Sequence, residues 1–392
     1  MLLGDGVLAI TGWIIKRLQP RQKVVCVVHG LDLIWPARWY QRLWVRRFLP
    51  ALDGLIAVSA PTRHHALAHG LAAAAITVIP NGIETETLAG SDAREDLARC
   101  LGRDVAHTHV LLTAGRLARR KGAAWFIREV LPQLAPNTLY VLAGAGPAFA
   151  EIQSAIRDTN LQGRVLLLGP VSDATRNLLL NTVDVFVQPN IPVPGDMEGF
   201  GIAVLEAAGC GRPVVAAALE GLLDAITPNE NGLLVAPAAA RWIATLNALL
   251  ADPQARHDLG AHAAQYTHQH YHWHGIAGAS RLGGTRRAVH PSALPLARDR
   301  SASRLGGTRR AVHPSALPLA RDRSASRRGA RRHLTPARAG ARAARRRSRL
   351  AANHAAMVYF APWTKRPPRP APTSFYHPLR RLRLGPRGAG SR

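Results

Sequence analysis

The sequence predicts an α/β protein that contains two doubly wound parallel-sheet domains followed by a tail of different composition. Short apolar runs rich in β-branched residues alternate with helical patterns, and a second such series starts near residue 107. Apolar strands that alternate with helices are typical of parallel sheets buried on both faces. The length of 392 residues and the hydrophobic content of 47% allow two or three domains with buried cores.

The first series, residues 1–107, predicts only part of a Rossmann-like domain. Residues 1–18, MLLGDGVLAITGWIIKRL, indicate a loop that enters a helix. A fully buried strand is expected over 23–30 and further strands over 54–60 and 76–82, with a helix between the last two. Such a domain normally has more strands, so we expect it to be shortened at its N-terminus, by a late start codon or a true truncation.

The second series, residues 108–279, predicts a complete doubly wound domain. Its apolar runs predict strands at 110–115, 139–146, 164–169, 183–189, 213–217 and 232–235. Its helical patterns lie between them, at 122–134, 149–159, 174–182 and 200–211. In such a sheet, ligands bind at the carboxyl ends of the strands.

Residues 280–392 form a basic tail that we expect to be disordered, because Arg, Ala, Pro, Gly and Ser dominate it. The tail holds 28 of the 51 Lys and Arg residues but only two of the 24 Asp and Glu residues, so the rest of the chain is nearly neutral. Residues 280–302 recur without a difference at 303–325.

This tail has two interpretations. Its positive charge would attract RNA or an anionic membrane face. Alternatively, a frameshift near codon 280 replaced the native C-terminal end by out-of-frame translation of GC-rich DNA. The second interpretation fits the exact duplication and the near absence of lysine, since Lys365 is the only one in the tail.

The cysteine content favours a reducing compartment. Cys26, Cys100 and Cys210 are far apart and match neither a zinc-binding spacing nor a disulfide framework. No apolar run approaches the roughly 20 residues of a membrane span. We therefore expect a cytoplasmic protein whose tail can contact the inner membrane face peripherally.

Two basic residues follow the first strand of the second series. Arg116 comes directly after this strand and Lys121 precedes the next helix. A guanidinium and an ammonium at the carboxyl edge of a parallel sheet suit a pyrophosphate. The alternative is a solvated basic loop, because Arg119 and Arg120 lie beside them.

The next two junctions carry backbone features. Gly144 lies in the turn LAGAGP, which suits close approach of a ligand but is also compatible with a plain tight turn. Gly169 and Val171 lie in LLLGPVSD, where the backbone can read a nucleobase edge. The alternative there is a helix N-cap built on Ser172 or Asp173.

Two glutamates flank a Gly-Phe-Gly turn in MEGFGIAVLEAAGCGRPVVA. The turn and the helix start, Gly199, Phe200, Gly201 and Ile202, would present free backbone N–H groups to an anion. Glu206 lies on an otherwise apolar helix, where a buried carboxylate needs donors such as the two hydroxyls of a ribose. Glu198 precedes the helix and could accept from sugar hydroxyls. The alternative for Glu206 is a salt bridge to Arg212.

Together, GRLARRKG, LAGAGP, LLLGPVSD and EGFGIAVLEAAGCGRPVVA resemble the donor domain of the retaining GT-B glycosyltransferases of family four, with their Glu-x7-Glu motif. VVHGLDLIW, GLIAVSAPTRHHAL and ITVIPNGIE resemble the later strands of the acceptor domain. The resemblance runs from about residue 4 to 279. The first strand and the glycine-rich loop of the family have no counterpart.

The resemblance implies transfer of a sugar from a nucleoside diphosphate sugar, with retention, to an envelope polysaccharide or a lipid-linked acceptor. It implies that Arg116 and Lys121 bind the pyrophosphate and that Glu206 holds the ribose. Glu198 and His29 would act near the transferred sugar. It implies no cofactor and no metal ion, which agrees with the lack of an Asp-x-Asp motif.

Two other functions stay open. The first is another reaction of the GT-B fold, such as epimerisation of a sugar nucleotide. The second belongs to a different class, a protein that binds polyanions through its basic tail.

Overall fold

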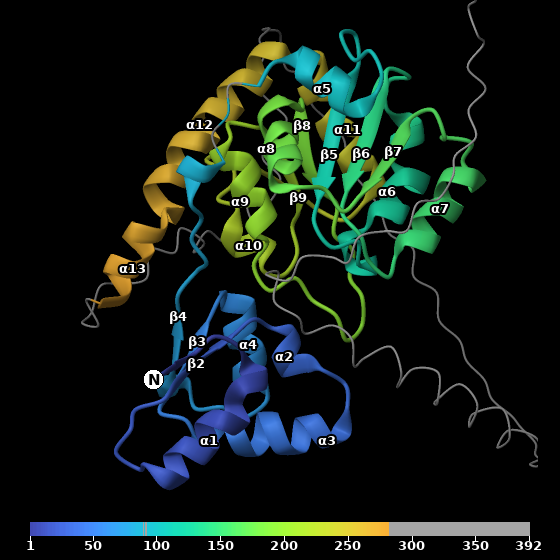
Figure 1. Ribbon diagram of the computed structural model, residues 1–392. Helices are drawn as coiled ribbons and strands as arrows, with labels where there is room; N and C mark the ends of the chain where they lie inside the picture. Colours follow the sequence, from blue (N-terminus) through green and yellow to red (C-terminus); the bar gives the residue numbers. More distant parts are fainter. Residues whose placement is uncertain (89, 91, 282–392) are drawn as a thin grey trace, which may run out of the picture. The chain divides into compact units, whose positions relative to one another are not determined.

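The computed structural model describes residues 1–88, 90 and 92–281 (Figure 1). The tail, with its repeat and the partners predicted for it, lies outside the described residues except for positions 280 and 281. The described chain contains two parallel sheets, one of four strands and one of six. This confirms the predicted α/β fold class with two Rossmann-like parts.

The first sheet has the order β1-β2-β3-β4, and all its strands are parallel. The strands are β1 (Leu2–Leu3), β2 (Val25–Val28), β3 (Gly54–Ala57) and β4 (Ile76–Val78). The α-helices are α1 (Ala9–Leu18), α2 (Leu31–Ile34), α3 (Arg38–Tyr40) and α4 (Ala60–Ala68), and α3 continues into a π-helix at Gln41–Phe48.

Two predictions for this part were wrong. The first residues are not a loop, because β1 pairs in parallel with β2. The strand predicted at 23–30 is not fully buried: Cys26 and Val28 are inaccessible, whereas Val25 and Val27 are half-buried. Helix α1 covers the buried face so tightly that a Cβ on Gly12 would lie 2.8 Å from side-chain atoms of Leu3 and Leu52.

The second sheet has the order β10-β9-β8-β5-β6-β7, again with parallel strands. The strands are β5 (His109–Ala114), β6 (Thr138–Ala143), β7 (Val165–Gly169), β8 (Val185–Gln188), β9 (Val214–Ala217) and β10 (Leu233–Val235). The chain starts at β5, runs outward to β7 and then returns to β8 on the other side of β5. The carboxyl ends of β5 and β8 therefore form a topological switch point, where ligands bind in this class of fold.

Helices lie on both faces of the second sheet, as the ribbon shows (Figure 1). They are α5 (Arg94–Leu101), α6 (Ala123–Glu129), α7 (Phe149–Asp158), α8 (Asp173–Thr182), α9 (Ile202–Gly209), α10 (Leu222–Ala225), α11 (Ala239–Ala251), α12 (Pro253–Tyr271) and α13 (Trp273–Arg281). Strands β5, β6, β8 and β9 are almost completely buried, which explains their continuous apolar sequence.

Helix α5 precedes the predicted boundary at residue 107 but packs with the second sheet. Leu97 and Leu101 belong to the core of that sheet. Arg94 extends from the same helix to the carboxylate of Asp184, at 3.0 Å. Among the described residues, none of the helices is long and apolar enough to cross a bilayer.

Candidate functional site

The carboxyl ends of β5, β6 and β7 bring the predicted glycine turns into direct contact. The N–H of Gly144 donates to the carbonyl of Gly169 at 2.7 Å. A Cβ on Gly144, whose φ is 141°, would lie only 1.9 Å from the carbonyl oxygen of Gly115. Only glycine fits this approach, so the backbone after β5 lies directly against the turn after β6.

The loop after β5 meets the loop after β8 through Lys121 and Glu198. The Lys121 Nζ lies 2.6 Å from Glu198 Oε2, and both side chains are 9% exposed. Arg120 also lies near, with its Nη2 3.7 Å from the same oxygen and its Nη1 3.4 Å from Asp196 Oδ1. Two cations from one loop therefore surround a single buried carboxylate at the switch point.

Backbone packing holds this ion pair together. Gly122 follows Lys121 in the left-handed region, with φ 68°, and a Cβ there would lie 1.8 Å from the carbonyl oxygen of Pro189. The turn before α6 and the loop after β8 are thus in contact at the point where the two charges meet.

Neutral donors complete the surroundings of the Glu198 carboxylate. Asn190 Nδ2 lies 3.3 Å and Gln188 Nε2 3.5 Å from Oε2, and both residues are almost inaccessible. Burial alone would raise the pKa of Glu198, but Lys121 and Arg120, with the hydrogen bonds from Lys121 and Asn190, hold it below its usual value. The group is therefore an ionised carboxylate at neutral pH.

Sequence reasoning missed several of these contacts. It named Arg120 only in the alternative of a solvated basic loop, whereas the Arg120 side chain is only 15% exposed. It did not single out Gln188 and Asn190, although polar residues at the end of an apolar strand are a detectable signal. It also missed Glu220, whose carboxylate accepts from the Glu198 N–H and whose φ of 49° is uncommon for a residue with a Cβ.

Glu206 lies on α9, directly after the Gly-Phe-Gly turn, and is half-buried. Its carboxylate forms no hydrogen bond or ion pair with any residue that the structure describes. Burial raises its pKa, which Arg176 offsets only in part. The alternative salt bridge to Arg212 does not form, because Arg212 donates to the carbonyls of Cys210 and Val183.

His29 follows β2, and its backbone touches the turn that holds Glu198. A Cβ on Gly199 would lie 2.0 Å from the carbonyl oxygen of His29. The imidazole Nε2 lies 2.9 Å from the carbonyl oxygen of Gly4, and the backbone N–H donates to Asp32. His29 could also be a structural residue, that is, a histidine hydrogen-bonded at the end of a strand. The contact of its Nε2 agrees with that alternative.

The remaining predicted site residues differ in how exposed their side chains are. Arg116 is exposed, Val171 is half-buried and Ile202 is 45% exposed. Phe200 is buried, with its ring centroid 6.2 Å from that of Tyr271, so only its backbone is available to a ligand. Gly201 caps α9 with a φ of 95°.

The alternative considered for the turn after β7 is also present. The Ser172 side chain accepts from the N–H of Thr175 at 3.1 Å and caps α8. This cap fixes the start of α8, directly after the turn that contains Gly169 and Val171.

Two family models match this chain. The model described as "Glycosyltransferase Family 4" matches residues 5–87, and the one described as "Glycosyl transferases group 1" matches residues 108–252. The first match covers β2, β3 and β4 of the four-stranded sheet, and the second covers the six-stranded sheet with the switch point.

Curated proteins are similar over most of the described chain. A "GDP-mannose-dependent alpha-(1-6)-phosphatidylinositol monomannoside mannosyltransferase" of Mycolicibacterium smegmatis is 28% identical over 72% of this chain and 75% of its own. A "D-inositol 3-phosphate glycosyltransferase" of Kineococcus radiotolerans is 30% identical over 65% of this chain and 61% of its own. The chain thus spans about three fifths of the length of the second relative.

A solved structure is also similar. Anabaena Alr3699/HepE in complex with UDP superposes with a TM-score of 0.61 and 25% identity, over 72% of this chain and 78% of that one. A UDP-glucose complex of the same protein has the same score and the same coverage.

Proposed function

We propose that this chain, whose residues 5–87 and 108–252 match models of glycosyltransferase families, transfers a sugar from a nucleoside diphosphate sugar, with retention, to a lipid-linked or polysaccharide acceptor. The observation that carries the proposal is the buried Lys121–Glu198 pair at the switch point. Two relatives are named for transfer to phosphatidylinositol monomannoside and to inositol 3-phosphate. These names favour an acceptor that contains phosphoinositol.

The cations of the loop after β5 would stabilise the departing nucleoside diphosphate. Breaking the bond between sugar and phosphate builds negative charge on the leaving group, and fixed cations and helix-end N–H groups can stabilise that charge. The Lys121 ammonium has three N–H donors, of which one goes to Glu198. The phosphates would be contacted by the two remaining N–H groups of Lys121, by the Arg116 side chain and by the backbone N–H groups from Gly199 to Ile202.

The two glutamates would hold the ends of the donor. All contacts of the Glu198 carboxylate with described residues go to Oε2, so Oε1 is available to a hydroxyl of the transferred sugar. The half-buried Glu206 carboxylate would accept from the ribose hydroxyls. A bound ribose would thus provide hydrogen-bond donors to a carboxylate that has no partner among the described residues.

The hydrogen bond to Gly4 fixes how His29 can act. Because a carbonyl oxygen only accepts, the neutral imidazole carries its proton on Nε2 and leaves Nδ1 as an acceptor. Among the described residues, Nδ1 has no partner. We place Nδ1 next to the transferred sugar, where it would accept from a sugar hydroxyl and orient the reacting carbon.

Acceptor-dependent release of nucleoside diphosphate tests the proposal. The full chain is incubated with UDP-glucose or GDP-mannose, with and without phosphatidylinositol vesicles or inositol 3-phosphate, and the product is examined by proton NMR. We expect release that needs an acceptor, is lost in His29→Ala, and gives a product with the anomeric configuration of the donor. Conversion of a nucleotide sugar to its epimer without an acceptor would instead support the alternative reaction.

A further inference from the structure

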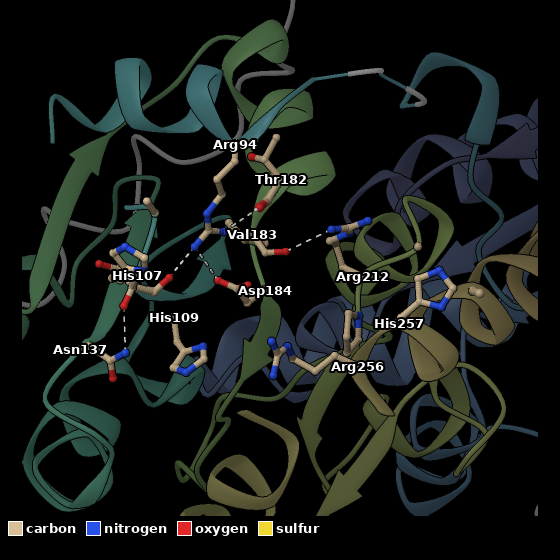
Figure 2. Close-up of a pocket in the computed structure, with 15 residues that line it drawn as sticks. Arg94, His107, His109, Asn137, Thr182, Val183, Asp184, Arg212, Arg256 and His257 are labelled. Atoms are coloured by element: carbon tan, nitrogen blue, oxygen red, sulfur yellow. Dashed lines mark hydrogen bonds and ion pairs between the residues drawn. The ribbon is translucent and has the colours of Figure 1, made fainter. Parts of the chain in front are cut away.

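A cavity of about 760 Å³ opens at the amino edge of the six-stranded sheet, opposite the switch point (Figure 2). Its lining includes His109 at the start of β5, Asp184 just before β8 and Pro213 just before β9. None of the predicted site residues lines it. The volume falls within the range of about 300–1,000 Å³ that is typical of small-molecule sites.

Basic side chains dominate this cavity. Six of its lining residues are arginine or histidine: Arg94, His107, His109, Arg212, Arg256 and His257. The lining contains a single carboxylate, that of Asp184. Its Oδ2 already accepts from Arg94 Nη2 at 3.0 Å and from the N–H of Val110 at 2.7 Å. Asp184 therefore compensates Arg94.

The other two guanidinium groups lack a carboxylate partner among the described residues. Arg212 donates to the carbonyls of Cys210 at 3.4 Å and Val183 at 3.3 Å. Arg256 donates to the carbonyls of Leu249 and Leu250, at the end of α11. A guanidinium has five N–H donors, so both groups keep donors and an uncompensated charge.

His109 also lines this cavity and has a lowered pKa, mainly because it is partly buried. The pKa of His109 lies below its ordinary value because the ring is partly buried, and because Arg256 and Arg94 oppose its protonation while Asp184 favours it. Figure 2 shows His109, Asp184 and Arg256 around the same space, although each comes from a different element.

We propose that this cavity binds a small molecule that carries a phosphate or pyrophosphate group, with Arg212 and Arg256 as its main contacts. Planar guanidinium groups bind phosphate through paired hydrogen bonds. The volume exceeds what one phosphate needs, so the site has room for an organic part. The tail of the chain itself is strongly basic and has the wrong charge to occupy it.

Calorimetric titration of the full chain with inorganic pyrophosphate tests this site. The double variant Arg212→Gln/Arg256→Gln removes both uncompensated charges. Its control, Arg157→Gln/Arg241→Gln, removes two charges at exposed positions outside the cavity. We expect binding to weaken by about tenfold or more in the first variant, because charge-assisted hydrogen bonds are lost, and to stay unchanged in the control. Equal affinity in both variants would overturn the proposal.

Two further variants separate this site from the donor site and from a folding defect. Arg116→Gln removes an exposed cation at the switch point, so a loss of pyrophosphate binding in this variant alone would place the ligand there and also overturn the proposal. His257→Glu adds a carboxylate to the cavity lining, at a side chain that is 76% exposed. We expect this variant to bind pyrophosphate more weakly than the wild type, and unchanged binding counts against the site.

Discussion

The Lys121 ammonium lies 2.6 Å from Oε2 of Glu198, and each side chain is only 9% exposed. The pair joins the loop after β5 to the loop after β8. It therefore links the two loops that flank the switch point of the second sheet.

Breaking this pair should destabilise the fold. Removing one partner of a buried pair leaves an uncompensated charge, so we expect Lys121→Met to lower the free energy of unfolding by about 3–5 kcal/mol. Arg128→Met is the matched control, because its pair with Asp158 is exposed and should contribute at most about 1 kcal/mol. Urea unfolding measures the free energy of unfolding of both variants. An equal loss in the two would show that the buried Lys121 pair stabilises the fold no more than the exposed Arg128 pair does.

The same pair should make stability depend on acid pH. The pKa of Glu198 is lowered from its ordinary value of 4.5 in the folded chain, so its contribution is fully present above that value and disappears as the pH falls through the lower folded value. We expect the wild type to lose stability more steeply below pH 4.5 than Glu198→Gln does. Urea unfolding at a series of pH values tests this, and parallel curves would contradict it.

Glu206 should behave in the opposite way. Its carboxylate has no partner among the described residues and burial raises its pKa, so the charged form weakens the fold at neutral pH. Glu206→Gln should therefore leave the free energy of unfolding unchanged or increase it by up to about 1 kcal/mol. A loss larger than this in urea unfolding would indicate a structural partner and argue against a ligand-binding role.

The close approach at Gly144 gives a backbone prediction. A Cβ at this position meets the carbonyl oxygen of Gly115 at 1.9 Å, and φ is 141°, so Gly144→Ala should cost about 3 kcal/mol or more. Gly163→Ala, where a Cβ meets nothing within 4 Å, should stay within about 0.5 kcal/mol of the wild type. Thermal unfolding of both variants decides, and a tolerated Gly144→Ala would mean that the turns after β5 and β6 do not touch.

The sequence predicted the second sheet well because its inner strands are buried on both faces. Strands such as β6, with all six residues buried, appear as continuous apolar runs. In the first sheet, β2 and β3 alternate between buried and half-buried residues, which the apolar runs did not show. The short strand β1 was missed because two residues carry no periodicity.

The candidate site was predicted in its parts but not in its contacts. The motifs located Lys121 and Glu198, but their ion pair depends on the approach of Gly122 to Pro189, which follows from the pairing of β5 with β8. The role of Glu220 depends on a backbone φ that no sequence pattern announced. The cavity at the amino edge combines side chains from distant segments and gave no signal in the sequence.

Calorimetric titration with UDP, GDP and ADP tests the central claim, that Glu206 and the Lys121–Glu198 pair line a site for a nucleoside diphosphate sugar. The full chain is compared with Glu206→Gln and with Glu95→Gln, which changes an exposed glutamate on α5. We expect one nucleotide to bind with a stoichiometry of one, about tenfold more weakly in Glu206→Gln and equally well in Glu95→Gln. Absence of binding by all three nucleotides, or equal affinity in both variants, would contradict the account.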